Sequence, residues 1–474
     1  MAKRTHPLFN RIVENVDITG FAAEGKAIAK IDNMVVFVNG GVPGDVANIR
    51  ILKTKRKFFE AEIVQLVSPS PDREMPFCGH FGTCGGCKWQ HLAYNKQVFY
   101  KQQQVANNIE RIGRVRYDGY QLLDILPSEE TTFYRNKLEF TFTSRRWLNK
   151  EDIETQKEQK NLEGLGFHVP GFFDKVLDVE KCWLQPEPSN QIRVAVKNFA
   201  LQNNLSFFDF KTNEGLLRNV IIRNTLDGKF MVCPVLNRNK KADIKKLLNF
   251  IKDSFAEVVS IWYFVNDKRN TSLNDLEPVH FWGEKTLVEK MENLTFSVGP
   301  KSFFQTNSRQ ALKLYSTVRE MAALTGHEIV YDLYTGTGTI ALFVAANAKK
   351  VVGIEYVEEA VENARQNATA NGIENSVSIV GDMAKILTTD FFVEHGKPDV
   401  IITDPPRAGM HPKVVEAIKH SGAKRIVYVS CNPASQARDI ELLAGFYSLE
   451  KVQPVDMFPH THHVESVALL TKIE

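Results

Sequence analysis

The chain lacks any apolar run that approaches the roughly 20 residues a membrane-spanning helix requires. Residues 1–7 also lack the apolar stretch of a secretory signal, and no internal repeat is visible. At 474 residues, however, the chain is too long for one hydrophobic core. These features predict a cytoplasmic protein of several domains without a membrane segment.

A strong net charge is absent as well, because acidic and basic residues nearly balance. The formal net charge is +3, and residues 1–67 account for it with ten Lys and Arg against seven Asp and Glu. The excess is concentrated in residues 53–59, a basic run that ends in two phenylalanines. Phosphate-binding surfaces combine positive charge with stacking rings in this way. The same run is compatible with the solvated edge of a β-hairpin.

Cysteine is scarce, at six residues, and a cytosolic chain rarely uses it in disulfides. Cys78, Cys84 and Cys87 lie close together in a glycine-rich loop that could aim three thiolates at one centre. Four thiolates are typical of a cubane iron–sulfur cluster or a structural zinc site, and Cys182 is the best candidate for the fourth. The spacing does not separate iron–sulfur from zinc. Cys233, within a strand pattern, is interpreted as a small buried hydrophobic residue.

The first part of the chain has the pattern of a β-domain. Short alternating segments fill residues 11–66 and are punctuated by glycine, proline and asparagine, which predicts a small barrel of the oligonucleotide-binding kind. A linker at 68–71 precedes the cysteine loop and a polar helical stretch, Tyr94–Arg111. Residues 123–298 are interpreted mainly as strands, with an exposed hairpin tip at 149–163.

From residue 308 onward apolar strands alternate with helices, the pattern of a parallel, doubly wound sheet. The first strand runs into a glycine-rich turn at 335–339, where the backbone can approach a ligand closely. The second ends at Glu355, which could accept both hydroxyls of a ribose, and the third delivers Asp382, which could meet an adenine amino group. These strand ends predict a nucleoside cofactor. The glycine pattern alone does not separate S-adenosylmethionine from NAD.

The next two strands end in reactive side chains. The fourth runs into Asp404-Pro405-Pro406-Arg407, whose prolines stiffen a turn that presents the Asp404 carboxylate at the sheet edge. The fifth ends at Cys431. Both loops should lie at the mouth of one crevice, because the carboxyl ends of parallel strands meet at the same edge. A buried strand-end thiol is the alternative interpretation of Cys431.

A thiolate and a base are the groups needed to methylate carbon 5 of uracil. Addition of a thiolate to carbon 6 makes carbon 5 nucleophilic towards a sulfonium methyl group. A base must then remove the carbon-5 proton before the thiol is eliminated, and Glu465 is the candidate. Glu465 lies near His460, His462 and His463, so a metal site is the alternative for this segment.

The chain resembles the bacterial RNA uracil-5-methyltransferases over essentially its whole length, especially the iron–sulfur-containing branch that modifies 23S ribosomal RNA. The motifs that match are Phe303-Phe304-Gln305-Thr306-Asn307, Asp332-Leu333-Tyr334-x-Gly336-x-Gly338, Asp404-Pro405-Pro406-Arg407, Ser430-Cys431-Asn432-Pro433 and His460-Thr461-x-His463-Val464-Glu465. The resemblance implies S-adenosylmethionine as the methyl donor. The cofactor-binding residues that it implies are Gln305, Tyr334, Glu355, Asp382 and Asp404. It implies Cys431 as the nucleophile and Glu465 as the base. The ligands that it implies for a [4Fe–4S] cluster are Cys78, Cys84, Cys87 and Cys182.

The resemblance also implies a multidomain α/β fold. A TRAM-like RNA-binding β-barrel is expected at residues 1–67 and a central β-rich domain with the iron–sulfur site at 68–300. A class I, Rossmann-like methyltransferase domain is expected at 301–474, with the helix at 94–111 packed against it. The implied activity is methylation of carbon 5 of a uridine in RNA, with 23S ribosomal RNA favoured over transfer RNA. Nothing in the sequence demands more than a monomer, so a monomer is expected.

Three other functions compete with this one. An amino-group methyltransferase would use an acid-Pro-Pro turn, but Arg407 replaces the aromatic residue usual there. An NAD-linked oxidoreductase would use the glycine turn but leaves Cys431 unexplained. A non-catalytic iron–sulfur RNA-binding protein would need neither Cys431 nor Glu465.

Overall fold

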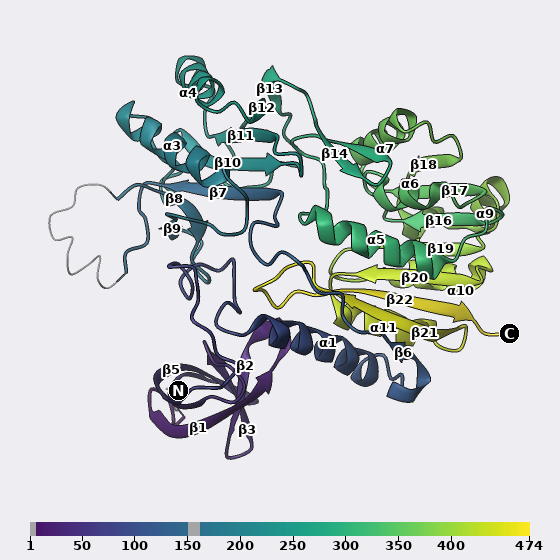
Figure 1. Ribbon diagram of the computed structural model, residues 1–474, viewed down its shortest axis with the longest axis horizontal. Helices are drawn as coiled ribbons and strands as arrows, with labels where there is room; N and C mark the ends of the chain where they lie inside the picture. The colour runs from purple at the N-terminus through teal and green to yellow at the C-terminus, as the bar shows by residue number, and fades with distance from the viewer. Residues whose placement is uncertain (1–5, 150–161) are drawn as a thin grey trace, which may run out of the picture.

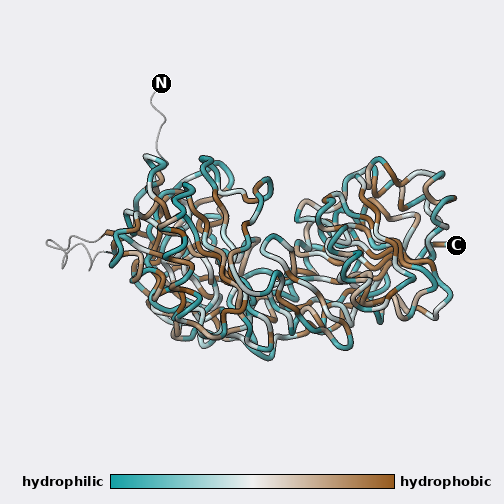
Figure 2. Tube along the Cα trace, turned by 90° about the horizontal axis from the view of Figure 1, so that it is seen from above, coloured by the Kyte–Doolittle hydropathy of each residue, from teal (hydrophilic) through white to brown (hydrophobic). Residues whose placement is uncertain are grey.

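The structure is a computed structural model, and it describes residues 6–149 and 162–474. The hairpin tip expected at 149–163 lies almost entirely outside the described residues. Seen from above, the chain forms two masses that are joined along one side (Figure 2). Within the described residues, no helix is both long enough and apolar enough to cross a membrane.

The N-terminal unit is a closed five-stranded barrel with the strand order β1-β2-β3-β5-β4 (Figure 1). Its strands are β1 (Ile12–Phe21), β2 (Ala27–Ile31), β3 (Met34–Asn39), β4 (Val46–Thr54) and β5 (Phe58–Ser68). Successive side chains of a strand point to opposite faces, so Ile49 and Ile51 are fully buried whereas the alternating residues Asn48 and Arg50 are not. The expected barrel is confirmed.

The basic run at 53–59 spans the end of β4, the turn at 55–57 and the start of β5. Lys53 Nζ donates a hydrogen bond of 2.8 Å to Glu60 Oε2 across this hairpin. Phe59 is only 2% exposed and belongs to the barrel core, whereas Phe58 is half-buried. The expectation of two stacking rings beside the charge is therefore wrong for Phe59, because alternation along β5 turns that ring inward.

The central unit is a seven-stranded sheet with the order β13-β12-β11-β10-β7-β8-β9. Its strands are β7 (Lys137–Thr143), β8 (Gly164–His168), β9 (Val176–Asp178), β10 (Leu217–Asn224), β11 (Phe230–Leu236), β12 (Val258–Val265) and β13 (Val279–Gly283). Cys233 is fully buried in β11, as the strand pattern predicts. A short hairpin, β14 (Leu287–Met291) and β15 (Leu294–Val298), follows this sheet.

The interpretation of residues 123–298 as mainly strands is confirmed within the described residues, and two helices accompany these strands. They are α3 (Ser189–Gln202) and α4 (Lys241–Ser254), and their apolar side chains share one core with the sheet. In α4 the buried residues Ile244, Leu247, Leu248 and Ile251 recur at the spacing of one helical face.

The C-terminal unit is built on an eight-stranded sheet with the order β18-β17-β16-β19-β20-β22-β21-β6. Its strands are β6 (Gln121–Leu122), β16 (Ile329–Leu333), β17 (Lys350–Glu355), β18 (Ser376–Val380), β19 (Val400–Thr403), β20 (Arg425–Ser430), β21 (Tyr447–Val455) and β22 (Glu465–Lys472). The strand order reverses beside β16, and β22 runs antiparallel to β20. This is the mostly parallel, doubly wound sheet expected, and the multidomain α/β fold class is confirmed.

Helices cover both faces of this sheet. The helices are α5 (Ser308–Ala322), α6 (Thr339–Ala345), α7 (Glu358–Ala370), α8 (Met383–Ile386), α9 (Thr389–His395), α10 (Pro412–Ser421) and α11 (Pro433–Leu443). Val330 joins the core beneath α5 and α6, whereas its neighbour Tyr331 joins the core beneath α10 and α11. Both strand faces are thus buried, which is why the strands of this region are continuously apolar.

The helix α1 (Tyr94–Arg111) connects the early part of the chain to this late sheet (Figure 1). Its residues Val105 and Ile109 are fully buried in the core that contains Leu443 of α11 and Val452 of β21. The short strand β6 then pairs with β21 at the edge of the sheet. Residues near position 100 therefore belong structurally to the C-terminal unit.

Candidate active site

The predicted catalytic residues lie at one edge of the C-terminal sheet. Ser430, the last residue of β20, pairs with Ser466 of β22, so Cys431 and Glu465 stand side by side just beyond this pair. Thr403 at the end of β19 pairs with Tyr428 of β20, which places the following Asp404 at the same edge. Three neighbouring strands thus bring the thiol and two carboxyl groups together.

Cys431 is half-buried and has a cationic neighbour. Burial raises the pKa of its thiol to about 11, and the Glu465 and Asp404 carboxyl groups add to the rise. The Arg407 guanidinium opposes this increase in pKa by its charge and by a hydrogen bond to the thiol. Asn432 Nδ2 also donates a hydrogen bond of 2.9 Å to the Arg407 carbonyl, which ties the two active-site loops together. Arg407 is therefore the group placed to stabilise a Cys431 thiolate.

Three acids lie near the thiol: Asp332 and Glu465 are buried, and Asp404 is partly buried. Burial, reinforced by Asp404, raises the pKa of Glu465 to about 8, and burial, reinforced by Asp332, raises that of Asp404 to about 7. The pKa of Asp332 rises to about 7, again because of burial. Thr335 Oγ1 donates a hydrogen bond of 2.5 Å to Asp332 Oδ2. Our sequence interpretation gave no role to Asp332 or Arg407; an acid within an apolar strand was the available signal for Asp332.

The raised pKa of Glu465 makes stability depend on pH. An unfolded chain releases this proton near pH 4.5, whereas the folded chain holds it to about pH 8. The stabilising contribution of the neutral form is therefore complete below pH 4.5 and is lost as the pH rises through about 8. We expect Glu465→Gln, which stays neutral, to match the wild-type melting temperature at pH 4 and exceed it by several degrees at pH 9. Equal melting temperatures at pH 9 would contradict the burial of a charge at this position.

The residues expected at a nucleoside cofactor follow the other strands of the sheet. Tyr334 comes directly after β16 and has a φ of 65°, at the start of the glycine-rich turn. Gly338 in this turn has a φ of 79°, and a Cβ there would lie 3.0 Å from the Ala364 Cβ of α7. Glycine is therefore required at position 338, both by the backbone conformation and by the close approach of the helix.

Glu355 and Asp382 hold backbone groups at the ends of β17 and β18. Glu355 accepts hydrogen bonds from the backbone N–H groups of Gly336 and Val357, at 3.2 Å and 2.9 Å. Asp382 caps α8 by accepting from Ala384 N at 3.1 Å. Both carboxylates thus lie where the sequence predicts, next to the glycine turn and to the end of the third strand.

Gln305 lies in the segment just before α5 and is 9% exposed. Its carbonyl accepts a hydrogen bond of 2.9 Å from Asn136 Nδ2, in the central unit. Thr337 of the glycine turn contacts the Phe303 carbonyl of the same segment. The segment 303–307 therefore joins the central unit to the turn that begins with Tyr334.

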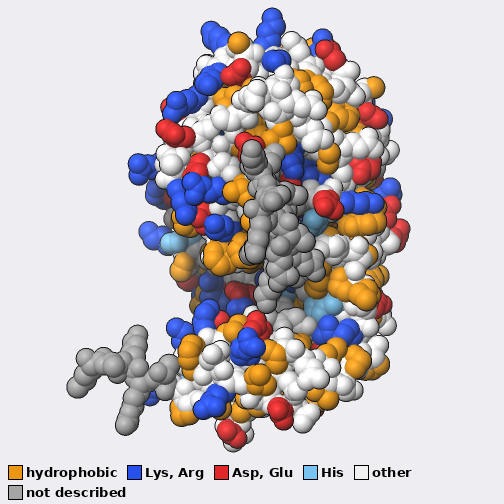
Figure 3. Space-filling view, turned by 90° about the vertical axis from the view of Figure 1, so that its left-hand side faces the viewer, with side chains coloured by type: hydrophobic (Ala, Val, Ile, Leu, Met, Phe, Trp, Pro, Cys, Tyr) orange, Lys and Arg blue, Asp and Glu red, His pale blue; other side chains and the backbone are white. Residues whose placement is uncertain are grey.

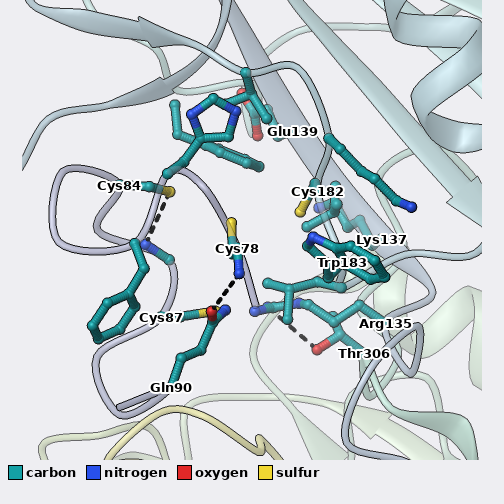
Figure 4. A pocket seen from close by; sticks show the side chains of 18 residues that line it. Cys78, Cys84, Cys87, Gln90, Arg135, Lys137, Glu139, Cys182, Trp183 and Thr306 are labelled. Carbon is teal, nitrogen blue, oxygen red and sulfur yellow. Dashed lines mark hydrogen bonds between the residues drawn. The ribbon is translucent and has the colours of Figure 1, made fainter. Parts of the chain in front are cut away.

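The four predicted cysteine ligands surround one cavity of about 370 Å³ (Figure 4). Cys78, Cys84 and Cys87 come from the glycine-rich loop, and Cys182 comes from the segment between β9 and α3. None of the four forms a disulfide. Lys181 Nζ lies 3.8 Å from the centre of the Trp183 ring at the border of the same cavity.

The cavity offers four sulfur donors, the set that a [4Fe–4S] cluster requires. Burial raises the pKa of Cys87 to about 12 and that of Cys182 to about 11, so both thiols are neutral at pH 7 without a bound cation. The donor set therefore fits such a group in kind. Among the described residues, however, no group of three or more His, Cys, Asp or Glu side chains stands ready to hold a metal ion. The same finding covers the histidines beside Glu465.

A cleft of about 740 Å³ leads to Cys431 from the barrel. The barrel contributes Phe21 and Phe37, α1 contributes Tyr100 and Arg111, and the catalytic loops contribute Arg407, Cys431 and His463 to its walls. Aromatic rings and cations thus both line this cleft between the barrel and Cys431. On the face formed by the central unit and the barrel, Lys and Arg side chains gather along one margin (Figure 3).

The loop 456–464 connects β21 to β22 and ends at Glu465. Lys101 Nζ of α1 donates a hydrogen bond of 2.6 Å to Asp456 Oδ1, and both side chains are fully buried. Gln97 of α1 contacts the His460 ring and accepts from its backbone N–H at 2.8 Å. Burial lowers the pKa of His460 to about 4, so its ring is neutral at pH 7. α1 therefore holds the segment that carries the candidate base.

The sheet, its covering helices and the polar strand ends define a class I methyltransferase domain coupled to a barrel. A family model described as tRNA (Uracil-5-)-methyltransferase matches residues 280–473, and the TRAM domain model matches residues 8–64. An uncharacterized RNA methyltransferase of Bacteroides thetaiotaomicron is 54% identical over 95% of this chain and 99% of its own length. A second uncharacterized RNA methyltransferase, of Porphyromonas gingivalis, is 50% identical over 96% of this chain and 99% of its own length.

A solved structure extends the similarity to the whole fold. The Pyrococcus abyssi tRNA (uracil-54, C5)-methyltransferase, in complex with S-adenosyl-L-homocysteine, superposes with a TM-score of 0.74. It is 28% identical and covers 97% of this chain and 99% of its own. The chain belongs to the family of S-adenosylmethionine-dependent RNA uracil-5-methyltransferases.

Proposed function

We propose that this protein methylates carbon 5 of a specific uridine in 23S ribosomal RNA, with Cys431 as the nucleophile and Glu465 as the base. The observation that carries the proposal is the pairing of β20 with β22, which sets Cys431 beside Glu465 at the edge where a cofactor-type glycine turn also ends. A nucleophile and a base on neighbouring strands can act on two adjacent atoms of one ring.

The reaction begins at the thiol. The Cys431 thiolate, stabilised by Arg407, forms a bond to carbon 6 of uracil, and the electrons of the 5,6 double bond move so that carbon 5 becomes nucleophilic. Bound S-adenosylmethionine supplies the methyl group that carbon 5 takes up. The Glu465 carboxylate then removes the remaining carbon-5 proton. The electrons of that bond restore the double bond, and the thiolate leaves carbon 6.

The cofactor would lie along the neighbouring strand ends. We assign its contacts to Gln305, Tyr334, Glu355, Asp382 and Asp404, in agreement with the motif matches. Asp332 Oδ1 is buried and has no hydrogen-bond partner within the described part of the chain, which suits a site completed by a polar ligand.

An RNA substrate suits the cleft better than a free nucleotide does. Cys431 lies at the end of a cleft whose walls include barrel and α1 residues, so the substrate is expected to extend well beyond one base. Rings such as Tyr100 and cations such as Arg111 suit stacked bases and phosphates. The target uridine must be flipped out of its stack, because a base within a helix does not expose carbon 6 to a thiolate.

Transfer RNA is the second candidate substrate. The Pyrococcus abyssi enzyme that superposes on the whole chain is a tRNA methyltransferase. The four-cysteine cavity, together with the barrel, favours ribosomal RNA through the resemblance to the 23S branch. The cytoplasmic location and the monomeric state expected from the sequence stay predictions.

The deciding experiment supplies labelled S-adenosylmethionine with hypomethylated 23S ribosomal RNA and unmodified transfer RNA in parallel. We expect 5-methyluridine in the ribosomal RNA alone. Label in transfer RNA alone would keep the chemistry and overturn the substrate. Label in neither RNA, from protein that binds the cofactor, would favour a non-catalytic RNA-binding protein.

We further propose that Cys78, Cys84, Cys87 and Cys182 hold a [4Fe–4S] cluster. Protein reconstituted without oxygen is expected to contain about four iron atoms per chain, with Cys182→Ser losing most of them. The matched control is Cys233→Ala, since Cys233 lies outside the cavity and should leave the iron content unchanged. Zinc in place of iron, or equal iron in both variants, would contradict the proposal.

A further inference from the structure

The loop 456–464 has both ends fixed by the sheet. Val455, the last residue of β21, pairs directly with Glu465, the first residue of β22. Asp456 is therefore the first residue beyond the pair that contains the candidate base. Its backbone N–H donates a hydrogen bond of 2.9 Å to the Leu126 carbonyl. Strand-like hydrogen bonding therefore extends one residue beyond the end of β21.

Asp456 is the acceptor at the centre of a buried polar network. Its Oδ1 accepts from Lys101 Nζ at 2.6 Å and from Phe458 N at 3.1 Å, and its Oδ2 accepts from the Tyr94 hydroxyl at 2.8 Å. Lys101 Nζ also donates to the Phe458 carbonyl at 3.0 Å. One ammonium group thus fixes both the first side chain of the loop and the backbone two residues later.

Two other segments meet the same loop. Lys88 and Trp89, which directly follow the cysteine loop, donate their backbone N–H groups to the His460 carbonyl at 2.8 Å and 3.0 Å. Asn307 Nδ2, at the start of α5, donates to the Met457 carbonyl at 3.0 Å. Among the contacts described for this loop, only the one between Lys101 and Asp456 places formal charges in the interior. A charge pair that is fully desolvated holds its geometry strongly, because either group alone would be costly to bury.

α1 also forms part of the cleft wall. Tyr100 and Gln104 line the cleft that reaches Cys431, whereas Lys101, between them in the chain, is fully buried against the loop. The same helical turn therefore faces the substrate path on one side and the loop that ends at the base on the other.

We propose that Lys101 is a positioning residue for the methyl transfer, which holds the loop 456–464 through Asp456 so that Glu465 reaches the carbon-5 proton. The inference rests on the proposed function, since it assigns a role relative to the Glu465 base. Lys101 touches neither the thiol nor the cofactor turn. Its loss should therefore impair proton removal and spare the addition of Cys431 to carbon 6.

This division of steps gives a signature that simple unfolding does not produce. When the base is misplaced, the enzyme still adds to uracil but eliminates slowly, so a covalent protein–RNA adduct accumulates. Lys101→Met should lower kcat by about 10- to 100-fold, leave the affinity for S-adenosylmethionine unchanged and increase the adduct retained on a denaturing gel. The matched control is Lys96→Met, because Lys96 lies on the same helix but pairs with Asp72 at the surface; it should behave as wild type.

Two further variants separate positioning from damage to the fold. Lys101→Met leaves the Asp456 charge buried alone, so the double variant Lys101→Met/Asp456→Asn should recover melting temperature while still accumulating the adduct. Tyr94→Phe removes one hydrogen bond to Asp456 and keeps the ion pair. It should therefore lower kcat and increase the covalent adduct less than Lys101→Met does.

The outcomes distinguish this inference from the proposed function. If wild-type protein neither methylates RNA nor forms an adduct, the proposed function fails. If wild type is active and the variants lose addition and turnover together, without extra adduct, Lys101 does not position the base. Wild-type kcat in the double variant would overturn the inference equally.

Discussion

Replacing Cys431 with alanine is expected to abolish methyl transfer, with kcat falling by at least about 10⁴-fold. Without the sulfur no bond forms to carbon 6, and carbon 5 of uracil stays too weak a nucleophile to take a methyl group. Because Cys431 lies at a loop and is only half-buried, the substitution should leave the fold intact. The measurement is transfer of labelled methyl groups to RNA, alongside cofactor binding by calorimetry.

The control for this prediction is Cys233→Ala, which removes a thiol from the core of the central sheet. It should retain methyl transfer, apart from any modest loss of stability. Cys431→Ala protein that still methylates RNA would contradict a covalent mechanism. Protein that loses cofactor binding as well would assign Cys431 a structural role.

Replacing Glu465 with glutamine should have the second largest effect. Turnover is expected to fall by about 10²- to 10⁴-fold, the usual contribution of a positioned base. The thiol can still add to uracil and carbon 5 can still be methylated, but the proton remains and blocks elimination. RNA should therefore stay covalently bound to the protein and migrate with it on a denaturing gel.

The double variant Cys431→Ala/Glu465→Gln tests the identity of this adduct. It should form none, because the sulfur that makes the bond is gone. An adduct that persists in the double variant would place the bond on another residue. Rapid turnover by Glu465→Gln alone would transfer the role of base to another group, of which Asp404 is the nearest acid in charge contact.

The candidate site was predictable from sequence where local patterns determine position. An apolar strand followed by a polar turn predicts which end of the sheet a residue occupies, and this rule places Asp404, Cys431 and Glu355 at the observed edge. Glu465 required the additional knowledge that β22 is antiparallel, so that its first residue meets the last residues of β20. That direction follows from pairing between distant segments and is invisible in a local window.

The raised pKa values of the active-site acids could not be predicted from the sequence. They depend on burial and on mutual approach, as between Asp404 and Asp332, which come from different strands. The ion pair between Lys101 and Asp456 was hidden for the same reason, since the two residues are 355 positions apart. A signal existed in α1, where the buried residues Gln97, Lys101, Val105 and Ile109 recur every four positions. A charged side chain is almost never fully buried without a partner, so Lys101 in this row indicates a buried group of opposite charge.

The attachment of α1 and β6 to the last strands also affects how the protein is made. On the ribosome, Lys101 waits roughly 20 to 70 seconds, at ordinary translation rates, before Asp456 is synthesised. During that interval the buried face of α1, which includes Val105 and Ile109, has no partner surface, and apolar side chains exposed in this way favour aggregation of a nascent chain. Pairing between such distant segments raises the contact order, and the candidate base and the eight-stranded sheet are in place only after β22 has been synthesised.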